Sequence, residues 1–316
     1  MPLPNDAKIL ALSEDLLKAM ETIFGAHPGF RPVHAKGALV TGTFTPSSAA
    51  ASLTRAAHAT RESTPVTVRF SDTTGIPLIP DNDPNASPRG CGLRFHLAEH
   101  VHTDIVAHSA NAFPARNGQE FLELLRAIGT SDLANLAGSP LEAFLGSHPK
   151  ALAFVQLPKP FPSSFGRESF FALTAMKFTN KDGVSKFGRY SILPEAGNDF
   201  LDDATAAGKS ANYLFDELTE RLAKGPIKFK LVVQVAEDGD VVDDATVQWP
   251  AERKVVELGT VTLTERVADD VAEQKYVIFD PIPRLDGIEP SDDPLLEVRA
   301  AVYLISGRRR RAAPAQ

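Results

Sequence analysis

The sequence predicts an α+β domain built on an antiparallel β-barrel with helical insertions. Runs rich in Val, Thr and Phe alternate with loops rich in Pro, Asn, Asp and Gly, which is typical of short antiparallel strands. No regular succession of strands and crossover helices occurs, so a parallel sheet is not expected. A barrel has no exposed edges, and we expect this one to enclose a cavity.

Strands are predicted in two groups, separated by helices. They cover residues 33–45, 65–71, 92–97 and 102–109, and then 170–179, 184–192, 228–236 and 255–263. Lys181, Asp182 and Gly183 lie between two of the later strands and predict a hairpin turn.

Helices are predicted where apolar residues recur at helical spacing. The first spans residues 13–24, with Ser13 as its cap and Gly25 as its end. Others are expected within residues 119–128, 140–154 and 211–223. The last lies in residues 290–311, where Ser291 or Asp292 can cap it and Gly307 can end it before a basic tail.

Length and composition limit the class of protein. The chain has 316 residues, 43% of them hydrophobic and 23% charged, and we expect one domain over residues 1–316. A net charge of -7 argues against a nucleic-acid partner. Cys91 is the only cysteine, which excludes an internal disulfide. Because no signal peptide or membrane-length apolar run is found, we expect a cytoplasmic protein without a membrane partner.

Arg299 and Tyr303 are four residues apart and therefore share one side of the last helix. A guanidinium beside a phenol favours its anionic oxygen, which can hold ferric iron. A surface pair is the competing interpretation of this spacing alone.

Further motifs occur in a fixed order along the chain. They are Arg31-Pro-Val-His-Ala-Lys-Gly37, Thr64-Pro-Val-Thr-Val-Arg-Phe-Ser71, Ser87-Pro-Arg-Gly90, Asp104-Ile-Val106, Lys186-Phe-Gly-Arg-Tyr190 and Ile288-Glu-Pro290. With the Arg299 and Tyr303 helix, this set resembles the haem catalases over residues 30–310. The long amino-terminal arm and carboxy-terminal helical domain of full-length catalases have no counterpart, so the chain is most similar to small catalase-related peroxidases.

The resemblance implies the catalase core fold, with haem b and its ferric iron as cofactor. It implies that Tyr303 is the axial iron ligand, polarised by Arg299, and that His34 is the acid–base residue on the other side of the haem. Ser71 would orient the His34 ring, and Val33 would contact the haem. The residues expected to bind the haem propionates are Arg31, Arg69, Arg308 and Arg310.

One position departs from the catalase pattern. Full-length catalases have an asparagine as second hydrogen-bond donor beside the distal histidine, and an ungapped alignment places Ser109 there. His108 and Asn111 are the alternatives. A short hydroxyl in place of an amide would favour oxidation of organic donors over release of oxygen.

The resemblance therefore implies a peroxidase that reduces hydrogen peroxide or organic hydroperoxides with small organic electron donors, with weak catalase activity. It would act in the response to oxidative stress, with a homodimer as the expected assembly. Two alternatives remain: a fatty-acid hydroperoxide-rearranging enzyme of the allene oxide synthase type, and a haem carrier or sensor without turnover.

Two other groups of residues contain potential metal ligands. His96, Glu99, His100 and His102 could bind zinc or non-haem iron, although their place in a predicted hairpin favours solvated side chains. Cys91 could be a haem thiolate, but its place within a strand favours an ordinary buried cysteine.

Overall fold

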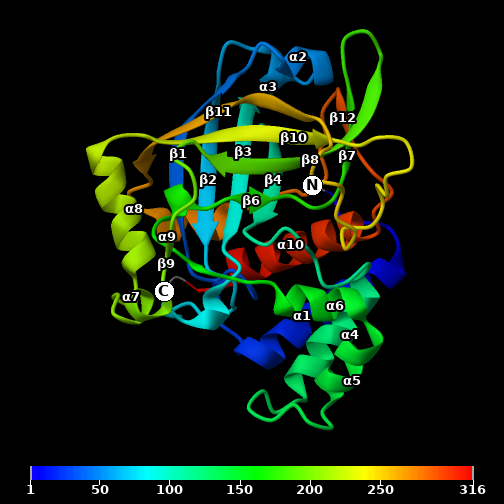
Figure 1. Ribbon diagram of the computed structural model, residues 1–316, viewed down its shortest axis with the longest axis vertical. Helices are drawn as coiled ribbons and strands as arrows, with labels where there is room; N and C mark the ends of the chain where they lie inside the picture. The colour runs from blue at the N-terminus through cyan, green and yellow to red at the C-terminus, as the bar shows by residue number, and fades with distance from the viewer. Residues whose placement is uncertain (1, 315–316) are drawn as a thin grey trace.

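A computed structural model describes residues 2–314 and contains a closed antiparallel β-barrel, as predicted (Figure 1). Around the barrel the strands run β10 (Ile227–Val235), β11 (Val255–Arg266), β1 (Gly37–Pro46), β2 (Thr64–Ser71), β3 (Gly90–Ala98), β4 (Val101–His108), β6 (Phe170–Phe171) and β8 (Ser185–Pro194). Pairing of β8 with β10, as in Ile192 opposite Leu231, closes it. β7 (Met176–Thr179) and β12 (Ile288–Pro290) extend from β8, while β5 (Phe161–Pro162) pairs with β9 (Phe200–Leu201).

Side-chain alternation directs one face of each strand into the barrel, where aromatic rings fill the interior. The rings of Phe70 and Phe165 stack with centroids 5.2 Å apart, and Phe44 meets Phe95 edge to face at 5.2 Å. The expectation that the barrel itself encloses the main cavity is therefore wrong, because these side chains occupy its interior.

The helices lie around the barrel. They are α1 (Ala7–Phe24), α2 (Ala50–Leu53), α3 (Ala57–Thr60), α4 (Gly118–Gly129), α5 (Pro140–Ser147), α6 (Pro149–Gln156), α7 (Asp203–Ala207), α8 (Tyr213–Lys224), α9 (Asp270–Tyr276) and α10 (Leu295–Ala312), with short 3-10 turns at Pro84–Ala86 and Phe165–Arg167. α10 packs against α1, which in turn packs against α4, and the three lie on one side of the barrel (Figure 1). Their contact is apolar, as between Leu17, Leu122 and Val302. No helix within residues 2–314 is long and apolar enough to cross a membrane.

Several predicted boundaries differ from the observed ones. α1 begins at Ala7, where the Asp6 carboxylate caps it, while Ser13 lies inside the helix and donates to the Ile9 carbonyl. Pro149 starts α6, so the helix predicted over residues 140–154 is two helices. The strand predicted over residues 170–179 is likewise divided into β6 and β7.

The two ends of α10 also differ from prediction. Asp293 accepts a hydrogen bond from the Leu295 amide at 2.9 Å, so the cap is neither Ser291 nor Asp292. Gly307 is buried inside the helix, where an added Cβ would overlap the Ile278 side chain. Gly307 therefore permits close packing, and the helix continues to Ala312.

Candidate active site

A cavity of about 250 Å³ lies between the outer face of strands β2, β3 and β4 and the helices α10 and α1. Period-two alternation explains the location, because Phe70 points into the barrel while its neighbours Arg69 and Ser71 line the cavity. His108 on β4 and Tyr303 on α10 also line it. The cavity thus collects side chains from distant parts of the sequence.

His34 lines this cavity from the loop that precedes β1. The strand predicted over residues 33–45 begins only at Gly37, and His34 has a left-handed backbone with φ +56°. This conformation is uncommon for a non-glycine residue. It is held by hydrogen bonds from the His34 amide to the Thr73 carbonyl at 2.7 Å and from the Ala35 amide to the Thr74 carbonyl at 3.0 Å.

The His34 ring is oriented by Ser71, whose Oγ lies 3.1 Å from Nδ1. Nε2 has no hydrogen-bond partner among residues 2–314. Burial, with the nearby Arg69 and His108, lowers the pKa of His34 to about 3. The imidazole is therefore neutral at pH 7 and able to accept a proton.

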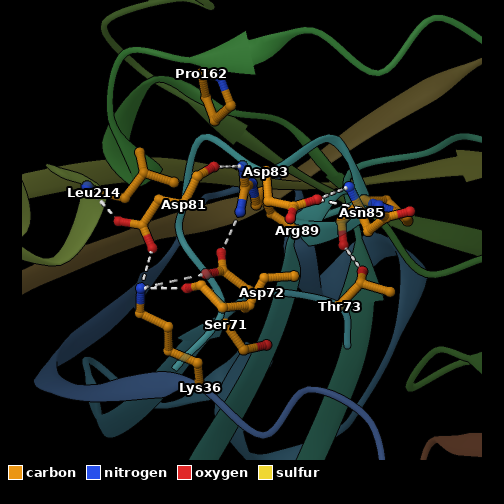
Figure 2. A network of polar contacts seen from close by, with 12 residues as sticks. Lys36, Ser71, Asp72, Thr73, Asp81, Asp83, Asn85, Arg89, Pro162 and Leu214 are labelled. Atoms are coloured by element: carbon orange, nitrogen blue, oxygen red, sulfur yellow. Dashed lines mark hydrogen bonds and ion pairs between the residues drawn. The ribbon is translucent and has the colours of Figure 1, made fainter. Parts of the chain in front are cut away.

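A buried network of charges fixes the loop on which His34 lies (Figure 2). The Lys36 ammonium contacts the Asp81 carboxylate at 2.5 Å and lies 3.9 Å from Asp72, and Asp72 pairs with the Arg89 guanidinium. Arg89, Asp72 and Asp81 are fully buried. The sequence does not predict this network, because charges in a Pro- and Asp-rich loop are typical of solvated side chains.

Of the three candidates for the second polar position beside His34, only His108 lines the cavity. His108 faces the cavity, and its Nδ1 accepts a hydrogen bond from the Ala110 amide at 3.3 Å. Burial, with Arg299, lowers the pKa of His108 to about 4. The Ser109 hydroxyl instead accepts from the Arg89 amide at 2.9 Å, and Asn111 is exposed. Neither Ser109 nor Asn111 lines the cavity.

Across the cavity, Arg299 and Tyr303 lie one turn apart on α10, as their spacing predicts. The Arg299 Nε donates to the Tyr303 hydroxyl at 3.3 Å. Both residues are half-buried and line the cavity, which disfavours the interpretation as a surface pair. Val33 is also part of the lining.

Three arginines form a cluster of positive charge at the cavity. Arg31 and Arg310 both donate to the Val277 carbonyl, at 3.0 and 2.9 Å, and Arg69 lies near them. Within residues 2–314 none of the three forms an ion pair, and Nε of Arg310 is buried without a partner. Burial lowers the pKa of all three guanidinium groups, and repulsion between them lowers the pKa of Arg31 and Arg69 further. The pKa of Arg69 falls to about 9.

A buried cationic cluster that forms no ion pair with a carboxylate calls for an anionic ligand. The apolar lining suits a large flat ring, the phenol suits ferric iron, and the arginines suit two carboxylates. These residues therefore fit a haem. Arg308, predicted in the same group, is exposed and does not line the cavity.

The competing metal sites are not supported. Glu99 and His100 are solvent-exposed, and His96 is engaged with Thr67 at 2.9 Å. In the described part of the chain no three His, Cys, Asp or Glu side chains come together in a metal-binding arrangement. Cys91 belongs to the apolar core of the barrel and also borders the cavity, and burial raises its pKa and disfavours a thiolate.

Fold and site together define a barrel protein of the haem-binding class, with a tyrosine facing the cavity. The family model described as "Catalase" matches residues 28–315. This chain therefore belongs to the catalase family.

Two curated relatives cover nearly the whole chain. A catalase-related peroxidase from Mycolicibacterium paratuberculosis is 34% identical over 300 residues, covering 94% of both chains. A catalase-related peroxidase from Synechococcus elongatus is 32% identical, covering 94% of this chain and 88% of its own length.

Solved structures show the same fold. A fungal catalase superposes with a TM-score of 0.79 at 22% identity, covering 89% of this chain and 59% of its own. A bacterial catalase gives a TM-score of 0.78 at 23% identity, covering 97% and 62%. The chain thus spans about 60% of these longer catalases.

Proposed function

We propose that this protein is a haem peroxidase that reduces hydrogen peroxide or organic hydroperoxides with small organic electron donors, with weak catalase activity. The observation that carries this proposal is a single cavity containing a neutral imidazole, a phenol paired with a guanidinium, and arginines without carboxylate partners. The two similar proteins named catalase-related peroxidase support the reaction class.

The cofactor in this proposal is haem b with ferric iron. Tyr303 would ligate the iron through its phenol oxygen, and Arg299 would stabilise the anionic form of that oxygen through Nε. Arg31, Arg69 and Arg310 would bind the two carboxylates of the haem. When bound, haem supplies the redox chemistry by which peroxide is cleaved and a donor oxidised.

His34 moves the proton in this reaction. Ser71 engages Nδ1 and leaves Nε2 without a protein partner, so Nε2 can take the proton of a peroxide in the cavity. The same nitrogen can then return that proton to the departing oxygen. A neutral imidazole is available at pH 7, because burial keeps the pKa of His34 far below 7.

His108 would be the second group that positions the peroxide. Its Nδ1 accepts from the Ala110 amide, so in the neutral ring the hydrogen lies on Nε2. His108 therefore offers a hydrogen-bond donor, while Nε2 of His34 offers an acceptor. A hydroperoxide carries both kinds of partner atom.

The first test is the visible absorption spectrum of the ferric, haem-loaded protein beside that of Tyr303→Phe. A phenolate-ligated high-spin spectrum that changes character in the variant supports the assignment of the ligand. A protein that binds no haem, or keeps its spectrum in Tyr303→Phe, refutes it.

The second test compares peroxide consumption with and without an aromatic donor, for the parent and His34→Ala. A peroxidase needs the donor and loses turnover in His34→Ala while keeping haem. Rapid loss of a fatty-acid hydroperoxide without donor would indicate a rearranging enzyme instead. Unchanged behaviour in His34→Ala would indicate a carrier.

A further inference from the structure

Gln274 on α9 has a buried side-chain amide that connects Arg69 of the arginine cluster to the backbone of Gly37. It is 8% exposed. Its Oε1 accepts a hydrogen bond from Nε of Arg69 at 2.7 Å, and its Nε2 donates to the Gly37 carbonyl at 2.9 Å. Both polar atoms of this side chain are thus used, one of them on Arg69.

The remaining hydrogen bonds of Arg69 also go to neutral groups. Its Nη2 donates to the carbonyls of His34 at 2.9 Å and Ala35 at 3.2 Å. Nη1 has no hydrogen-bond partner in the described part of the chain, and Arg69 lines the cavity. The guanidinium is therefore held on two of its nitrogens while the third is left for a ligand.

The carboxylates nearest to Arg69 are engaged with other arginines. Asp270 lies 3.3 Å from the Arg266 guanidinium, and Asp72 pairs with Arg89. A carboxylate in place of the Gln274 amide would form a charge-assisted pair with Arg69 and cancel its charge. The amide makes the same hydrogen bond to Nε without that cancellation.

We propose that Gln274 is a positioning residue that holds Arg69 with a neutral group, so that the site keeps the positive charge that recognises a porphyrin with ionised carboxylates. This inference rests on the proposed haem function. It implies that Gln274 helps the site to bind haem with ionised carboxylates more tightly than an uncharged haem ester.

The test compares Gln274→Glu and Gln274→Met with the parent, using haem and its dimethyl ester as the two ligands. Affinity is measured from the rate of transfer to excess apomyoglobin and from optical titration. Gln274→Glu places a carboxylate against Arg69 and so removes the positive charge that Arg69 would offer to the haem carboxylates. We expect it to weaken haem binding by roughly 10- to 100-fold, the range for losing a hydrogen bond to a charged group. The dimethyl ester has no charge there, so its affinity should hardly change.

Gln274→Met separates charge from hydrogen bonding. It removes both amide hydrogen bonds but leaves the net charge of the cluster unaltered, so it should weaken haem binding less than Gln274→Glu does. Thermal unfolding of the apoproteins is the second measurement. Because the new carboxylate offsets repulsion between the arginines, the Gln274→Glu apoprotein should melt no lower than Gln274→Met.

Three results would overturn the inference: equal losses for haem and its ester in Gln274→Glu, an equal loss of haem affinity in Gln274→Met, or a Gln274→Glu apoprotein that does not fold. A parent that binds haem but shows one of these results leaves the proposed function intact. A parent that binds neither ligand refutes both.

Discussion

Replacing Lys36 by Met tests whether the buried charge network holds the loop that carries His34. The Lys36 ammonium donates to the Asp81 carboxylate at 2.5 Å and to the carbonyls of Ile79 at 2.8 Å and Ala211 at 3.0 Å. Lys36→Met keeps the apolar stem and removes the cation. It leaves the fully buried Asp81 carboxylate with the Leu214 amide at 2.8 Å and the neighbouring Asp72 carboxyl as its remaining partners.

The expected magnitude follows from the cost of an uncompensated buried charge. Removing one partner of a buried pair costs about 3–5 kcal/mol, against about 0–1 kcal/mol for an exposed pair. For a chain of this size that loss lowers the melting temperature by on the order of 5–10 °C. Asp81→Asn on the Lys36→Met background removes the stranded charge but keeps an oxygen for the Leu214 amide, so the double variant should lose roughly 1–3 kcal/mol less than the sum of the single variants.

Urea-induced and thermal unfolding of the apoproteins measure these losses. Lys177→Met is the matched control, because Lys177 pairs with Glu289 at 3.0 Å on the surface, with side chains 40% and 60% exposed. A Lys36→Met loss no larger than that of Lys177→Met, or strictly additive single losses, would refute the idea that this network supports the site.

Three further predictions concern ionisation and packing. The pKa of His34 is about 3, so its imidazole stays neutral between pH 5 and 8. The rate at which the haem-loaded protein reacts with peroxide in stopped-flow experiments should therefore vary less than about twofold over this range. A sigmoidal change of the rate near pH 6.5 would contradict this prediction. Burial raises the pKa of Glu168 from 4.5 to about 7. Between these two pH values the folded state binds more protons than the unfolded chain does, so the free energy of unfolding falls as the pH rises through this range. Glu168→Gln should remove a decline of roughly 3 kcal/mol between pH 5 and 8 in urea unfolding, and an unchanged pH profile would exclude this group. An added Cβ at Gly90 would lie 2.5 Å from the Ser71 Oγ and 2.7 Å from Nδ1 of His34, so it would displace the His34 ring. Gly90→Ala should therefore slow the peroxide reaction roughly 100-fold while the haem spectrum persists. A normal rate would show that the orientation of the ring is not critical.

Local rules predicted much of the fold. Period-two alternation located the long barrel strands, and the turn at Lys181-Asp-Gly183 occurs as expected, with Gly183 at φ +77°. Four-residue spacing on a helix was enough to predict that Arg299 and Tyr303 meet. Each of these features depends only on residues close together in the chain, so the local sequence is sufficient to predict it.

Tertiary packing decided which arginine of the basic tail lines the cavity. Gly307 lies inside α10 and lets the helix pass close to Ile278, and the helix continues beyond the predicted end to Ala312. Arg310 is seven residues from Tyr303, about two turns, and therefore lies on the same face, whereas Arg308 is turned away to solvent. A helix that ended at Gly307 would place neither.

Packing also decided the surroundings of His34. Its left-handed backbone depends on hydrogen bonds to residues 73 and 74, and its second polar neighbour depends on the register that sets His108 opposite Gly90. The sequence by itself determined the barrel strands, the phenol–guanidinium pair and the family resemblance. Only the tertiary structure shows that His108 and Arg310, rather than Ser109 and Arg308, line the cavity, and that buried charges support the His34 loop. Each of these depends on contacts between segments far apart in the chain.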